Sequence, residues 1–171
     1  MEQTYKILIE KANRIQLLLT DCDGVLTNGN VYYSKDGEEM KEFSLRDGMG
    51  VERLWKLENI ETGIITGEDS EIVRRRAEKL KITEYHPGCN NKYFTLLEIL
   101  EKKNITANQV AYIGDDVNDL EIMRHVGLSA CPSDAMPMIR EIAHLKMINK
   151  GGQGAFREFA EAIIHFKQKA K

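Results

Sequence analysis

The sequence predicts an α/β fold, with a mostly parallel sheet flanked by helices and a β-hairpin inserted after the first strand. Short apolar runs typical of buried strands recur along the chain. Between these runs lie segments whose apolar residues have helical spacing. The turn residues Lys35-Asp36-Gly37 mark the hairpin. Strands that alternate with helices form a parallel sheet through right-handed crossovers, an arrangement of the Rossmann-like class.

The first part of the chain contains a helix, a strand and the hairpin. Residues 2–13 form a short polar helix, and residues 15–19 form a strand because their apolar residues are nearly continuous. Residues 31–34 and 39–43 flank the turn at 35–37, so we expect them to pair as the hairpin. This insertion is too small to be a lid domain.

The rest of the chain alternates helices with strands. Apolar residues near a helical period predict helices over 47–58 and 70–80, and a buried apolar run predicts a strand over 62–65. The same reasoning gives the remaining elements: a strand over 83–85, a helix over 91–103, a turn over 106–109, a strand over 110–113, a helix over 119–125, a strand over 128–130, a helix over 136–142, a strand over 145–148 and a closing helix over 155–169.

The composition is that of a soluble globular protein, which we expect to form a single domain over residues 1–171. The net charge of −3 gives no sign of a nucleic-acid binder. No apolar run approaches the roughly 20 residues that span a bilayer, so we expect no membrane partner. Cys22, Cys89 and Cys131 form neither a zinc pattern nor a disulfide framework, which favours a reducing, cytoplasmic location.

The most informative motif is Asp21-Cys22-Asp23-Gly24, directly after the first apolar strand. In an open α/β sheet, ligands bind at that end of the strands. Two carboxylates so close repel each other, and a metal ion, a shared proton or basic neighbours must hold them there. The alternative is simple turn formation, because Asp and Gly are common in turns.

Three further motifs follow strands or open helices: Thr66-Gly67, Lys92 and Gly114-Asp115-Asp116-Val117-Asn118-Asp119. In a parallel sheet these ends converge with Asp21 and Asp23 on one edge. Such an excess of carboxylates needs a hard cation, and oxygen ligands suit Mg²⁺. The lysine and the threonine are then left to bind a phosphoryl group.

Each of these motifs also has a structural explanation. Lys92 alone is typical of a solvated helix surface, and Thr66-Gly67 alone is typical of a turn that ends a strand. Asp116 or Asn118 can serve as an N-cap for the helix that follows. Three aspartates are more than a cap requires, however, and an acidic cluster after a buried strand costs stability unless it is compensated.

Taken in order, these motifs resemble the haloacid dehalogenase superfamily of phosphohydrolases, over residues 17–119. The resemblance implies that Asp21 is the nucleophile, forming an aspartyl phosphate, and that Asp23 is the acid and base. It further implies the ligands and supporting residues of the site. These are Asp21, the backbone carbonyl of Asp23 and Asp115 for Mg²⁺, Asp116 and Asp119 to support that shell or orient Lys92, and Thr66, Gly67 and Lys92 for the phosphoryl oxygens.

The hairpin in place of a cap domain resembles the capless branch of the superfamily. Within it, Arg46-Asp47-Gly48-Met49-Gly50 and the glycine-rich residues 151–158 are similar to phosphatases of 3-deoxy-2-ulosonic acid phosphates. The resemblance implies a small sugar-acid phosphate as substrate. It also implies a homotetramer in which the hairpin of one subunit helps to close the site of the next.

The substrate's carbon number depends on residues outside the shared motifs. Members that act on the eight-carbon octulosonate 8-phosphate tend to carry Arg after Thr-Gly, whereas Glu68 stands here. We therefore expect a nine-carbon, sialic-acid-type nonulosonate 9-phosphate, with octulosonate 8-phosphate as the alternative. Arg76 and Lys79 share a helix face and are candidates, with Arg157, to bind the sugar carboxylate. A solvated basic surface is the alternative for these three residues.

Two other protein classes share part of this residue pattern. A phosphoacceptor signalling domain also joins Asp, Thr and Lys at one sheet edge, but there the acidic pair and the phosphorylated aspartate lie on different strands. A non-catalytic oligomerisation module, like the domain fused to some sialate cytidylyltransferases, predicts decayed catalytic positions. Here all of those positions are intact.

Overall fold

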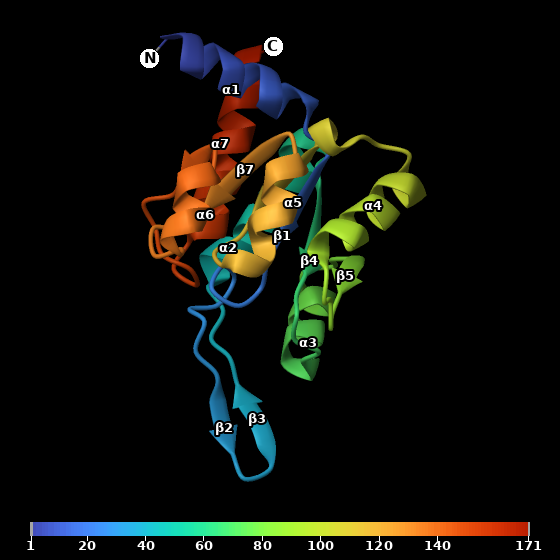
Figure 1. Ribbon diagram of the computed structural model, residues 1–171, viewed down its shortest axis with the longest axis vertical. Helices are drawn as coiled ribbons and strands as arrows, with labels where there is room; N and C mark the ends of the chain where they lie inside the picture. Colours follow the sequence, from blue (N-terminus) through green and yellow to red (C-terminus); the bar gives the residue numbers. More distant parts are fainter. Residues whose placement is uncertain (1, 171) are drawn as a thin grey trace.

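A six-stranded parallel sheet forms the centre of the molecule, in the order β5-β4-β1-β6-β7-β8 (Figure 1). The computed structural model of the chain describes residues 2–170. The predicted fold class is confirmed. The strands of this sheet are β1 (Leu17–Thr20), β4 (Glu61–Ile65), β5 (Glu84–His86), β6 (Val110–Ile113), β7 (Leu128–Cys131) and β8 (Leu145–Lys146).

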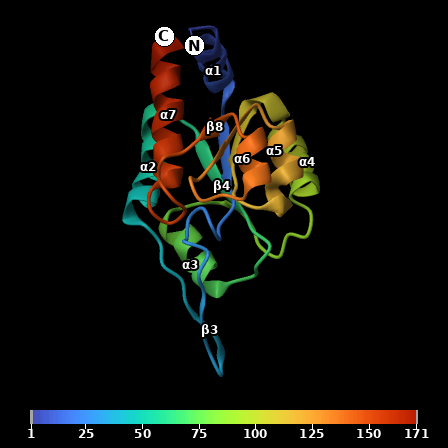
Figure 2. The same ribbon diagram turned by 60° about the vertical axis from the view of Figure 1, so that its left-hand side comes forward.

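Helices cover both faces of the sheet: α1 (Glu2–Arg14), α2 (Leu45–Glu58), α3 (Glu71–Lys79), α4 (Lys92–Lys103), α5 (Leu120–His125), α6 (Pro137–Ile142) and α7 (Ala155–Ala170). Figure 2 shows α2 and α7 on one side, with α4, α5 and α6 on the other. The side chains of β1 alternate accordingly, with Leu18 in the core under α2 and α7, and Leu17 and Leu19 in the core under α4, α5 and α6. Within residues 2–170, no helix has the length and hydrophobicity needed to cross a membrane.

The hairpin, β2 (Tyr32–Ser34) and β3 (Gly37–Met40), projects from the edge where β1 ends (Figure 1). Its turn is tighter than the three residues predicted, because Gly37 pairs with Ser34 at a φ of +116° and already belongs to β3. The second strand stops at Met40 instead of reaching Phe43. Beyond Met40 the chain turns inward, and Lys41 is buried.

Two of the other boundary differences each follow from a single hydrogen bond. Ile15 was expected in the first strand, but its N–H bonds to the carbonyl of Ala12 as the helix ends. Ile148 was expected in the last strand, but the Glu158 carboxylate accepts from its N–H at 3.0 Å, and β8 ends at Lys146. Ile148 is left 86% exposed.

Candidate active site

The carboxyl ends of β1, β4 and β6 bring the predicted motifs to one edge of the sheet. Asp21 follows β1, and its N–H bonds to the Ile113 carbonyl of β6 at 3.0 Å. Thr66 follows β4, and Asp115 lies two residues after β6. Asp21 and Thr66 are buried. A small set of polar groups is therefore enclosed where three neighbouring strands end.

Lys92 lies at the start of α4, in the middle of the acidic cluster. Its ammonium is 2.9 Å from Asp21 Oδ1 and 2.6 Å from Asp119 Oδ1. Only 2% of its side chain is exposed, so it is not a solvated surface lysine. Although burial by itself lowers it, the pKa of Lys92 is raised because the charges of Asp21 and Asp119 and their hydrogen bonds outweigh desolvation. The lysine is therefore charged and fixed beside Asp21.

Asp119 organises this cluster from a fully buried position. Its Oδ1 accepts from Lys92 and from the Tyr112 hydroxyl, each at 2.6 Å. Its Oδ2 accepts from the backbone N–H groups of Asp115 and Asp116 at 2.8 and 3.3 Å. Both oxygens thus accept hydrogen bonds from the protein, which fixes Lys92 and the loop after β6; a supporting role for Asp119 around a metal ion stays a prediction.

Asp116 acts as the N-cap of the short 3₁₀ turn η2 (Val117–Asp119). Its Oδ1 accepts from the Val117 N–H at 2.6 Å. One of the three aspartates of the motif therefore performs the capping role that was weighed as a structural alternative. A supporting role for Asp116 around a metal ion stays a prediction.

Asp21 and Asp115 carry the electrostatic signature of a cation site. Burial, followed by repulsion from Asp119, raises the pKa of Asp21 to about 7 against the opposing effect of Lys92. Burial, followed by repulsion from Asp21 and Asp119, raises the pKa of Asp115 to about 8. Oxygen atoms of Asp21, Asp115 and Asp119 lie within 4.8 Å of one another, and Asp115 Oδ1 is buried without a hydrogen-bond partner among the described residues.

Gly24 makes room for this arrangement. It has a φ of +87°, and a Cβ added there would lie 2.0 Å from Asp115 Oδ2. The unpartnered oxygen, the surplus of buried carboxylates and the all-oxygen donor set fit Mg²⁺. Asp21, Asp115 and the carbonyl of Asp23 are the groups that would hold it.

Asp23 is partly exposed and is held by two side chains. Its Oδ1 accepts from the Thr27 hydroxyl at 3.0 Å, and its Oδ2 lies 2.6 Å from the ammonium of Lys41. Lys41 was not among the residues predicted for the site. It lies in the run Glu38-Glu39-Met40-Lys41-Glu42, where the local pattern reads as an exposed, charged strand.

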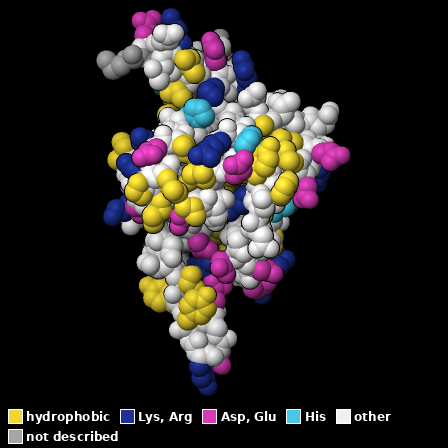
Figure 3. Space-filling view, in the orientation of Figure 1, with side chains coloured by type: hydrophobic (Ala, Val, Ile, Leu, Met, Phe, Trp, Pro, Cys, Tyr) yellow, Lys and Arg dark blue, Asp and Glu magenta, His cyan; other side chains and the backbone are white. Residues whose placement is uncertain are grey.

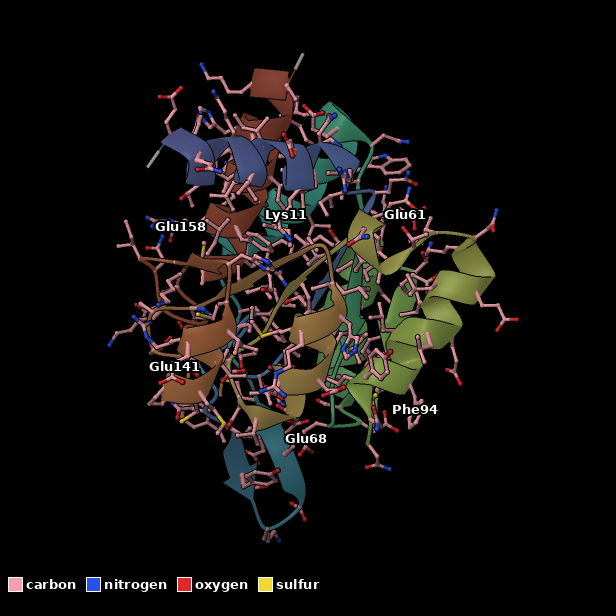
Figure 4. The ribbon with its side chains drawn as sticks, turned by 45° about the horizontal axis from the view of Figure 1, so that its top comes forward. Lys11, Glu61, Glu68, Phe94, Glu141 and Glu158 are labelled. Atoms are coloured by element: carbon pink, nitrogen blue, oxygen red, sulfur yellow. The ribbon has the colours of Figure 1, made fainter. Side chains whose placement is uncertain are left out.

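Thr66 and Glu68 occupy the loop after β4. The hydroxyl of Thr66 accepts from the Glu68 N–H at 3.4 Å, and the Thr66 carbonyl accepts from the Cys89 N–H at 2.9 Å. These bonds fix the short loop that contains Gly67. The side chain of Glu68 is exposed at the edge of the sheet from which the hairpin projects (Figure 4).

Arg76 and Lys79 do not meet at the site. Arg76 donates to the Ser44 carbonyl at 2.9 Å and stacks on the Phe43 ring, so it anchors the chain that enters α2. Lys79 lies at the far end of α3, where it lines a cavity of about 700 Å³ with residues at the start of β4, such as Thr62. The structure gives no support to a role for Lys79 at the carboxyl edge of its own subunit.

Arg157 lies in the first turn of α7 (Ala155–Ala170), and both its side chain and its backbone contact protein groups. Its Nε lies 2.8 Å from Glu161 Oε1, and its backbone N–H donates to Asp47 Oδ1 at 2.8 Å. Asp47, from the Arg46-Asp47-Gly48 motif, is buried and joins the start of α2 to the start of α7. In this structure the motif therefore has a structural role.

Residues 52–154 match the family described as haloacid dehalogenase-like hydrolase. The chain belongs to this family. It is 40% identical to the 3-deoxy-D-manno-octulosonate 8-phosphate phosphatase of Escherichia coli K12 over 157 residues, which cover 92% of this chain and 83% of that protein.

Solved structures of family members agree with this assignment. The 3-deoxy-D-manno-octulosonate 8-phosphate phosphatase of Yersinia pestis superposes with a TM-score of 0.90 at 39% identity, covering 95% of this chain and 88% of that one. The corresponding Moraxella catarrhalis enzyme, in complex with magnesium, phosphate and KDO, gives 0.91 at 34% identity, covering 99% and 94%.

The family assignment confirms the predicted enzyme class, a phosphoric monoester hydrolase of the haloacid dehalogenase type, and excludes a phosphoacceptor signalling domain. The predicted cofactor, Mg²⁺, is also confirmed: it agrees with the acidic cluster of this chain and with the magnesium in the Moraxella catarrhalis structure.

Proposed function

We propose that this chain hydrolyses 3-deoxy-D-manno-octulosonate 8-phosphate, releasing the free sugar acid and inorganic phosphate. The observation that carries the proposal is the 40% identity, over 92% of the chain, to an enzyme named for this substrate. The product KDO and phosphate in the Moraxella catarrhalis structure support it. These findings favour the eight-carbon substrate over the nine-carbon one, which the sequence analysis ranked first.

The proposed chemistry begins with attack by a carboxylate oxygen of Asp21 on phosphorus. As that bond forms, the bond from phosphorus to the sugar oxygen breaks, and Asp23 gives its proton to the leaving oxygen. Water then attacks the aspartyl phosphate while Asp23 takes a proton from it. Phosphate leaves, Asp21 is again a carboxylate and Asp23 is again protonated, so the cycle closes.

The remaining residues of the site compensate charge. The Lys92 ammonium lies 2.9 Å from Asp21 Oδ1, where it can donate hydrogen bonds to the phosphoryl oxygens of a substrate at Asp21. The Thr66 hydroxyl, at the end of the neighbouring strand, can donate another. When bound to Asp21, Asp115 and the Asp23 carbonyl, Mg²⁺ would neutralise the phosphate and its acidic surroundings. Asp119 accepts four hydrogen bonds, which hold the Lys92 ammonium and the loop after β6 in position.

A homotetramer in the cytoplasm is part of this proposal. Large apolar side chains are exposed on the hairpin, where Tyr33 is 70% and Met40 58% exposed, and the space-filling view shows yellow side chains on its surface (Figure 3). Such side chains favour a partner subunit. The three cysteines are free thiols, as a reducing compartment favours.

A nonulosonate 9-phosphate is the second candidate substrate, and Glu68 is the residue that favours it. Its exposed carboxylate lies on the loop that follows Thr66, where it can accept hydrogen bonds from additional sugar hydroxyls. An octulosonate has one carbon fewer in its side chain. If Glu68 binds a hydroxyl of the longer side chain, it would lack that hydrogen-bond partner with the octulosonate.

The deciding experiment compares kcat/KM for the two sugar-acid phosphates with Mg²⁺ present. The proposal requires octulosonate 8-phosphate to be the better substrate. Glu68→Ala is then expected to change the two values in equal proportion, as is Glu78→Ala, a matched change on the exposed surface of α3. A higher kcat/KM for the nonulosonate, lost selectively in Glu68→Ala, would establish the second candidate instead.

A further inference from the structure

Lys41 is buried at a point where its neighbours in the chain are exposed. Met40 and Glu42 face solvent, whereas the side chain of Lys41 has no exposed surface. Burying an ammonium is costly unless it is paired, and Lys41 has two carboxylate partners. They are Asp23, at 2.6 Å, and Glu38, at 3.2 Å.

The pairing fixes the orientation of Asp23. Lys41 holds Oδ2 while the Thr27 hydroxyl holds Oδ1, so both oxygens of the carboxylate are directed by the protein. Each carboxylate oxygen has two lone pairs, and one on each remains available for a proton. The contact therefore orients the carboxylate without preventing proton exchange.

The contact also joins Asp23 to the hairpin and to α3. Glu38, which binds the other side of the ammonium, lies in β3 and accepts a hydrogen bond from the hydroxyl of Ser70. Ser70 precedes the first turn of α3, and its hydroxyl forms no cap bond with that helix. A continuous polar chain thus runs from α3 through Glu38 and Lys41 to Asp23.

We propose that Lys41 is the positioning residue for Asp23, holding its carboxyl in the orientation needed for proton exchange with the leaving oxygen and then with the attacking water. This inference rests on the acid–base role proposed above for Asp23. Because Lys41 follows β3 directly, the orientation of Asp23 depends on the seating of the hairpin.

The test compares two phosphates of similar size that differ in their need for an acid. The 4-nitrophenolate ion leaves readily without a proton, whereas the benzyl alcohol oxygen of benzyl phosphate needs one. Since kcat/KM reports the steps up to loss of the alcohol, it isolates the acid function. The variants are Lys41→Met, Lys41→Arg as a rescue, and Lys35→Met as a matched change at the exposed hairpin turn.

We expect Lys41→Met to lower kcat/KM for benzyl phosphate at least about tenfold more than for 4-nitrophenyl phosphate, as loss of acid catalysis does. Lys41→Arg should recover most of the benzyl phosphate activity, and Lys35→Met should match the wild type. If Lys41→Met does not fold, Lys41→Gln allows the same comparison. Equal losses on both phosphates, or no loss, would overturn the proposal.

Asp23→Asn separates this inference from the function on which it rests. If Asp23→Asn is selective for the leaving group and Lys41→Met is not, the positioning role of Lys41 is wrong while the acid–base role of Asp23 stands. If Asp23→Asn itself lowers both activities equally, the acid–base assignment fails, and the proposal for Lys41 fails with it.

Discussion

Replacing Asp47 by Asn should change how the stability of this protein depends on pH. Asp47 is 2% exposed, and its Oδ2 has no hydrogen-bond partner among the described residues. Its Oδ1 accepts from the backbone N–H of Arg157 at 2.8 Å. Burial raises the pKa of Asp47 from 3.8 to about 6, against the lowering effect of the backbone N–H groups of Arg157 and Gly154 and of the charges of Arg76 and Arg157.

The sign and size of the effect follow from this pKa. The folded protein holds the Asp47 proton more tightly than the unfolded chain does, so this contribution to stability is fully present below pH 3.8 and is lost as pH rises through 6. At about 1.4 kcal/mol for each pKa unit, the contribution is about 3 kcal/mol. Asp47→Asn cannot ionise and keeps an acceptor oxygen for the Arg157 N–H.

Urea denaturation between pH 4 and 7, at one protein concentration, measures the effect. The free energy of unfolding of the wild type should fall relative to that of Asp47→Asn by up to about 3 kcal/mol across this range. Asp36→Asn, the same change in the exposed hairpin turn, should run parallel to the wild type. A constant difference between the wild type and Asp47→Asn would refute the reasoning.

Three further predictions concern the site and the assembly. Asp21→Asn should fold but lose at least about a thousandfold in phosphate release, because the attacking charge is gone; a rate within tenfold of wild type would contradict the nucleophile assignment. Excess chelator should abolish turnover and Mg²⁺ restore it, whereas Gly24→Ala should need more Mg²⁺ because its Cβ displaces Asp115. Gly37→Ala is the control, since it shares a positive φ but has open space around it. Light scattering should give the mass of a tetramer, and a monomeric mass at working concentration would rule the assembly out.

The sequence was sufficient to predict the parallel sheet and the loops that end its strands. Apolar runs such as the one before Asp21 identify buried strands, and strands that alternate with helices favour a parallel sheet. Residues that follow such strands then share an edge, which is why Asp21, Thr66 and Asp115 could be expected near one another. The pattern does not determine element boundaries, because these depend on single hydrogen bonds such as the one that Ile148 donates to Glu158.

Tertiary structure alone decided which charged side chains meet. The spacing of Arg76 and Lys79 places them on one helix face but does not say what that face packs against. The contact of Lys41 with Asp23 spans 18 residues, and that of Arg157 with Asp47 spans 110. The local sequence does not predict such pairs, because the residues around a hairpin lysine are the same whether its side chain is solvated or buried. Only the tertiary packing that buries Lys41 excludes water from its ammonium and brings Asp23 to it as a partner beside Glu38.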